Sequence, residues 1–152
     1  MINPVHENSL RQILDGVMLG NKAAIDLCIT LFGIAQIWDD IIDGDTVTAR
    51  DVDAAFVSAL VAIPTNPISQ LMPELPWHIY NVFLRWRDAT NIENNNPTDS
   101  DLHKCYMLRA GFYDIPLLIA AKLYGDEHAE KVGVTVRRMY GEIFEEYAKE
   151  FK

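Results

Sequence analysis

The sequence predicts an all-α fold: a single-domain bundle of about five to seven helices that spans residues 1–152. Three observations support this prediction. Segments with apolar residues at helical spacing follow one another along the chain, strand-like alternation is nowhere long enough to matter, and residues 25–43 form one almost uninterrupted apolar run. A chain of 152 residues is the size of one domain and is long enough to bury a sizeable core.

The run from Ile25 to Asp43 predicts the central, buried helix of this bundle. It carries no charge between Asp26 and Asp39, and its apolar residues leave no polar stripe. A helix that is apolar almost all round is typically buried, and this one is shorter than the roughly 20 residues needed to span a bilayer. Gly44 is a natural stop signal, so we expect the helix to end at Asp43.

Three aspartates crowd the end of this helix: Asp39, Asp40 and Asp43. The helix dipole is negative there, so each exposed carboxylate costs about 0.3–1 kcal/mol. Carboxylates one helical turn apart share a face, and their position after an apolar run favours a bound cation. The alternative interpretation is a solvated acidic helix end in an acidic protein.

Caps and helix breakers predict the other elements. We expect helices at residues 8–19, 48–63, 76–91, 98–124 and 127–152, with at most one helical turn at 68–72. Thr48 with Asp51 resembles a capping box. Pro116 should kink the fourth of these helices, because its ring clashes with the carbonyl of Phe112.

Composition excludes several classes of function. A net charge of −9 argues against binding to nucleic acid, which needs a basic face. Cys28 and Cys105 lie in helical patterns without metal-ligand spacing, so we expect reduced core thiols in an intracellular, cytoplasmic protein. The N-terminal residues have neither the basic region nor the apolar core of a signal peptide, and no transmembrane segment is expected.

The segment QIWDDIIDGD resembles the aspartate-rich motif of class I isoprenoid synthases, the trans-polyprenyl diphosphate synthase family. Residues 109–144 are similar to the later helices of that family. The resemblance implies that Asp39, Asp40 and Asp43 hold Mg²⁺, which grips an allylic diphosphate, in a reduced prenyltransferase or terpenoid-synthase-like protein. It also implies that Arg50 and Arg109 contact the diphosphate.

The family has a second aspartate-rich motif, which this chain lacks. Glu142, Glu146 and Glu150 are each four residues apart and predict an acidic stripe that could serve as the opposing face; the alternative is a solvated surface. Another subunit could also supply the missing wall. The aromatic helix at residues 76–91 has apolar residues on more than one face, which predicts a homodimer formed through helices.

Two other interpretations stay open. All-α nucleoside triphosphate pyrophosphohydrolases also bind Mg²⁺ through helix carboxylates, and the pairs Asp40–Asp43 and Glu142–Glu145 fit that logic loosely. The chain could instead be a non-enzymatic helical scaffold or interaction protein, for instance one encoded by a phage or mobile element, because a fold does not imply a function.

Overall fold

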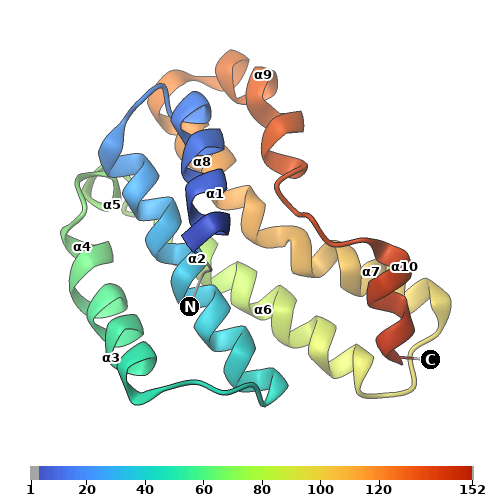
Figure 1. The fold of residues 1–152 in the computed structure, drawn as a ribbon. Coiled ribbons are helices and arrows are strands. Elements are labelled where there is room, and N and C mark those ends of the chain that lie inside the picture. The colour runs from blue at the N-terminus through green and yellow to red at the C-terminus, as the bar shows by residue number, and fades with distance from the viewer. Residues whose placement is uncertain (1–3, 152) are drawn as a thin grey trace. The chain divides into compact units, whose positions relative to one another are not determined.

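The computed structural model describes residues 4–151, with their side chains from Glu7 onward. In this range the chain consists of helices joined by short connections and contains no β-strand, which confirms the predicted all-α fold (Figure 1). Seven of the described α-helices have nine or more residues: α1 (Pro4–Val17), α2 (Lys22–Asp43), α3 (Ala49–Val57), α6 (Leu75–Glu93), α7 (Asp99–Arg109), α8 (Asp114–Tyr124) and α9 (Asp126–Arg137).

The helices form two compact units, one up to Pro73 and one from Glu74 onward. The assignment of the whole chain to one domain stays a prediction. None of the helices in the described residues is long and apolar enough to cross a membrane.

In the first unit the other helices are arranged around α2, as the sequence predicts. Helices α1 and α3, and the short elements that follow α3, all contact it. Helix α2 begins three residues earlier than expected, because the side chain of Asn21 caps it by accepting a hydrogen bond from the Ala24 amide. Its buried side chains lie mostly in the first part of the helix: Ala24, Ile25, Leu27, Cys28, Ile29, Leu31, Ala35 and Ile37.

The segment after α2 contains the predicted capping box. The Thr48 hydroxyl accepts from the Asp51 amide, and the Asp51 carboxylate accepts from the Thr48 amide. Helix α3 continues into a π-helical turn, η1 (Ser58–Ala62), and the short helices α4 (Ile63–Thr65) and α5 (Pro67–Leu71). The wide turn precedes Pro64, whose missing N–H and bulky ring disfavour a regular α-helix.

In the second unit, α6 packs on α7 and α8 packs on α9. One core cluster joins α6, α7 and the C-terminal segment through buried side chains: Ala89, Leu102, Cys105, Tyr147 and Ala148. A capping box opens α7, in which Thr98 and Asp101 exchange hydrogen bonds.

Two long helices expected in this unit are interrupted, so these predictions were wrong. A 3₁₀ turn, η2 (Ala110–Tyr113), separates α7 from α8, and Pro116 therefore lies in the first turn of α8, where its missing N–H leaves no bond unmade. The last predicted helix is also interrupted: α9 ends at Arg137, and helical geometry resumes only in α10 (Phe144–Tyr147) and the 3₁₀ turn η3 (Ala148–Phe151).

Candidate functional site

The three predicted metal ligands lie on the last two turns of α2. Asp39 and Asp40 are half-buried and Asp43 is exposed. Gly44 ends the helix in the left-handed conformation, with φ of 78°, and donates its amide to the Asp40 carbonyl. The last turn of α2 contains no basic residue, and the negative end of the helix dipole lies there.

Gln36, one turn before Asp40, constrains the orientation of that carboxylate. Its side-chain amide donates to Asp40 Oδ1 at 2.7 Å. Successive residues of a helix point about 100° apart, so Asp39 and Asp40 diverge, and Asp43 shares a face with Asp39 rather than closing a cage around one point. Accordingly, no group of three metal-ligating side chains is preformed within the described part of the chain.

An open arrangement of this kind limits the choice of cation. Mg²⁺ usually keeps several waters and binds through one or two carboxylates together with substrate phosphates, whereas Ca²⁺ and Zn²⁺ take more protein ligands. The carboxylates at the end of α2 are therefore compatible with a Mg²⁺–phosphate complex rather than with a structural metal.

Arg50, the first arginine implied in diphosphate binding, lies in the first turn of α3 and is exposed. It forms no hydrogen bond or ion pair within the described residues. The carboxylate next to it is already engaged, because hydrogen bonds from Thr48 hold the pKa of Asp51 below its usual value. Arg50 therefore keeps its donors for solvent or a ligand.

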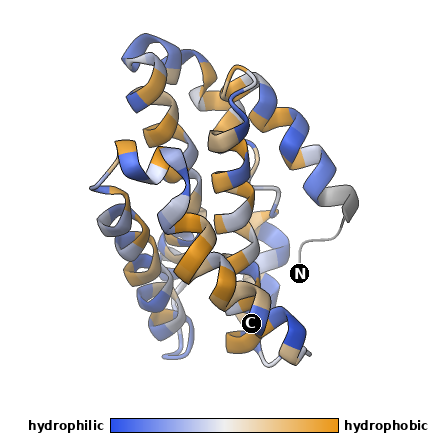
Figure 2. Ribbon diagram, turned by 90° about the vertical axis from the view of Figure 1, so that its left-hand side faces the viewer, coloured by the Kyte–Doolittle hydropathy of each residue, from blue (hydrophilic) through white to orange (hydrophobic). Residues whose placement is uncertain are grey.

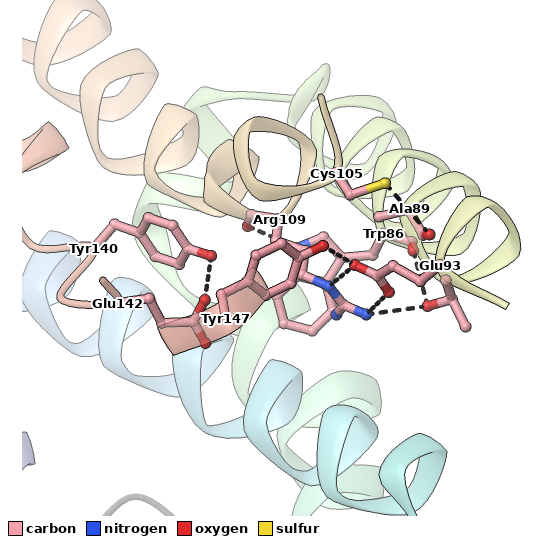
Figure 3. A network of polar contacts seen from close by, with 9 residues as sticks. Trp86, Ala89, Glu93, Cys105, Arg109, Tyr140, Glu142 and Tyr147 are labelled. Carbon is pink, nitrogen blue, oxygen red and sulfur yellow. Dashed lines mark hydrogen bonds and ion pairs between the residues drawn. The ribbon is translucent and has the colours of Figure 1, made fainter. Parts of the chain in front are cut away.

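Arg109, the second implied arginine, forms an ion pair with Glu93 (Figure 3). Its Nε and Nη2 donate to the two carboxylate oxygens of Glu93 at 2.9 and 2.5 Å. The Arg109 side chain is 16% exposed and that of Glu93 only 3%. The guanidinium lies over the Trp86 ring, 5.9 Å from its centroid, and the indole N–H donates to the Arg109 carbonyl at 2.8 Å.

The hydroxyl of Tyr147 completes this network by donating to Glu93 Oε1. Its pKa is raised, first by burial and then by this hydrogen bond, so the tyrosine stays a neutral donor. The network therefore ties the C-terminal segment to α6 and α7, and the charge of Arg109 is balanced within the protein.

Sequence reasoning missed Glu93. A signal was present, because Trp86, Ala89 and Glu93 recur at helical spacing on one face of α6. A carboxylate on a buried face requires a partner of opposite charge or a set of donors. The spacing to Arg109 and Tyr147 follows from the hairpin between α6 and α7 and from the returning C-terminal segment, which local patterns do not reveal.

The three glutamates do not form one stripe on a continuous helix, because the chain is not helical at Glu142. That residue lies in the connection before α10, while Glu146 is in α10 and Glu150 is in η3. The Glu142 carboxylate accepts from the Tyr140 hydroxyl at 2.6 Å, and its carbonyl accepts from the Tyr106 hydroxyl at 2.5 Å. Glu146 and Glu150 are exposed. The helical stripe was therefore wrong, and a metal-binding role of these residues stays untested.

The aspartates and Arg50 belong to the first unit, whereas Arg109 and the glutamates belong to the second. No model of a protein family matches the chain, and no curated protein or solved structure is detectably similar to it. The resemblance to class I isoprenoid synthases stays a prediction from the sequence of residues 36–45 and 109–144.

Proposed function

We propose that the chain binds a diphosphate ester through Mg²⁺ held at the C-terminal end of α2. The observation that carries the proposal is the placement of Asp39, Asp40 and Asp43 on the last two turns of α2, directly after a stretch, residues 27–38, that carries no charge. Carboxylates destabilise such a helix end unless a cation compensates them. The exposed Arg50 of the same unit is the residue best suited to contact the diphosphate, because Arg109 is paired with Glu93.

The chemistry that such a site supports is departure of pyrophosphate. A diphosphate leaves as an anion when a cation neutralises the charge that develops on its oxygens, and a bound Mg²⁺ supplies this neutralisation. The residues of this chain would contribute by holding the cation. The expected activity is a reduced form of prenyl transfer or terpenoid synthesis.

Thermal unfolding with Mg²⁺ and pyrophosphate tests the binding step. A ligand that binds only the folded chain raises Tm by mass action, so Mg²⁺ with pyrophosphate should raise Tm and Asp40→Asn should abolish the rise. Asp15→Asn, an exposed change of the same charge in α1, is the matched control and should keep it. An equal rise in wild type and Asp40→Asn would overturn the proposal.

A second assay separates the enzyme classes. The protein is incubated with Mg²⁺ and either an allylic diphosphate or a panel of nucleoside triphosphates, and released pyrophosphate is measured. Release from the allylic diphosphate alone is expected. Release from nucleotides alone would favour the pyrophosphohydrolase interpretation, and release from neither would favour a scaffold.

One further observation favours self-association, with or without catalysis. The continuous helix formed by α3 and η1 contains no buried residue. Phe56, Val57, Leu60 and Val61 lie on one face and are 54–71% exposed. Figure 2 shows the chain coloured by hydropathy from the side of these helices. Large apolar side chains grouped in this way typically mark an interaction surface.

We infer that a second copy of the chain covers this face. The sequence carries no charge from Ala54 to Met72, although the net charge is −9. Two copies of an acidic chain repel each other least where both contacting surfaces are uncharged. The apolar face of α3 and η1 on one copy can pair with the same face on the other about a two-fold axis. Leu60→Lys should convert a dimer to a monomer in sedimentation at micromolar concentration, whereas Val134→Lys, at an apolar position of α9 that is 62% exposed, should not. A monomeric wild type would contradict this inference.

A further inference from the structure

Two arginines in the second unit converge on one carboxylate. Arg85 of α6 donates through Nη1 to Asp114 Oδ2 at 2.7 Å, and Arg137 of α9 donates to the other oxygen, Oδ1. Asp114 is the first residue of α8. The three side chains therefore connect α6, α8 and α9, and both oxygens of the single carboxylate are engaged.

Arg85 is held in place by its surroundings as well as by Asp114. Its Nη2 donates to the Met107 carbonyl at 3.1 Å. Its guanidinium also passes directly over Gly111, where an added Cβ would lie 2.5 Å from Cζ. Because Gly111 has no side chain, the Arg85 guanidinium can pack directly against the η2 turn. This contact helps to hold the positive charge in one position.

The three side chains of Arg85, Arg137 and Asp114 together carry a net positive charge. Two guanidiniums face one carboxylate, which leaves one net positive charge in a chain of net charge −9. The Arg137 side chain is 55% exposed and uses one of its five N–H donors within the described residues. Guanidinium donors match the oxygens of a phosphate in pairs.

We propose that Arg137 and Arg85 form a binding site for a phosphate group that needs no metal ion. Asp114 orients the two guanidiniums, and the outer donors of Arg137 contact the phosphate oxygens. A purely structural ion-pair network would use the same three residues, but it would not respond to an added anion. The site lies in the second unit and is distinct from the carboxylates at the end of α2.

The test measures binding of inorganic phosphate and of pyrophosphate in the presence of EDTA. Calorimetry gives the affinity, and the Nε–Hε NMR signals of Arg85 and Arg137 report the location. Arg137→Gln should weaken binding at least about tenfold, as expected for lost charge-assisted hydrogen bonds. Arg138→Gln removes the same charge from the exposed neighbour and should change the affinity less than about threefold, the size of a screened surface effect.

Two more variants separate binding from structure. Asp114→Asn removes the negative charge but keeps one side-chain oxygen that accepts from an arginine. It should therefore tighten phosphate binding, whereas a structural network predicts no gain. Gly111→Ala displaces the Arg85 guanidinium and should weaken binding while α6 and α7 stay folded, as judged by circular dichroism. Equal losses in Arg137→Gln and Arg138→Gln, or absence of a shift in both arginine signals, would overturn the proposal. Because EDTA removes Mg²⁺, Asp40→Asn should leave this binding unchanged even if the α2 site fails.

Discussion

At the scale of single residues, the pair of Glu93 and Arg109 depends on complete hydrogen bonding. Removing two charges from water costs several kcal/mol for each ion, and their attraction offsets this cost only when the geometry is good and the remaining donors and acceptors are satisfied. Here both oxygens of Glu93 accept from Arg109, and one also accepts from Tyr147. The tyrosine hydroxyl is therefore part of the charge compensation.

Tyr147→Phe tests this contribution, because it removes the hydroxyl and keeps the ring in the core cluster. A hydrogen bond to a buried charge contributes about 1.5–3 kcal/mol, so the free energy of unfolding in urea should fall by that amount. Tyr106→Phe is the matched control. Its hydroxyl donates to the neutral carbonyl of Glu142, and its loss should cost only about 0.5–1.5 kcal/mol. Equal losses would show that Glu93 does not need Tyr147.

The raised pKa of Tyr113 leads us to expect a loss of stability at alkaline pH. Burial, with a smaller effect of Glu142, raises its pKa to about 12, against roughly 10 in the unfolded chain. Between these values the folded chain retains a proton that the unfolded chain releases, so this stabilisation is complete below about pH 10 and is lost as pH rises toward 12. The free energy of unfolding should fall over this range. The fall should be smaller in Tyr113→Phe than in wild type or in the control Tyr80→Phe.

At the scale of elements, Gly44 and Gly33 have opposite roles in α2. Gly44 ends the helix with φ of 78°, whereas Gly33 lies in the helix interior with nothing within 4 Å of an added Cβ. Gly44→Ala should destabilise the first unit by about 1–2 kcal/mol, and Gly33→Ala should stabilise it by about 0.5–1 kcal/mol. Urea unfolding monitored by circular dichroism measures both. If both variants shift stability in the same direction, the assigned end of α2 is wrong.

The elements that could be predicted are those whose ends are marked locally. Gly44 marks the end of α2, and Thr48 with Asp51 marks the start of α3. The carboxylates at the end of α2 could be located for the same reason, since they follow an apolar run that stops at a glycine.

The helix interruptions after α7 and before α10, which the sequence did not predict, accompany contacts between residues that are distant in the sequence. The interruption before α10 accompanies hydrogen bonds from Tyr106 and Tyr140 to Glu142, and the first of these spans 36 residues. The end of α7 accompanies the approach of Arg85 to Gly111. Local periodicity carries no information about such contacts, so the helices predicted from it at residues 98–124 and 127–152 were too long.

At the scale of the whole molecule, the charges divide unevenly between the two units. Up to Pro73 there are nine acidic and three basic residues, and from Glu74 onward thirteen acidic and ten basic residues. The net charge is −6 in the first unit and −3 in the second, so the first unit attracts a cation more strongly and the second repels an anion less. The positions of the two proposed sites follow this division.

The two cysteines make the predicted single domain testable, because each unit contains one. Cys28 and Cys105 are both buried, and burial raises the pKa of Cys28 to about 12, so neither thiol should react in the folded chain. Alkylation is measured by peptide mass spectrometry along a urea titration, and each thiol becomes reactive when its own unit opens. Units of this size rarely reach more than about 3–5 kcal/mol of stability alone. We therefore expect both thiols to become reactive at the same urea concentration, with Cys28→Ala and Cys105→Ala as controls that each remove one signal. Midpoints that differ reproducibly would show that the chain is two domains and that the two proposed sites can be studied apart.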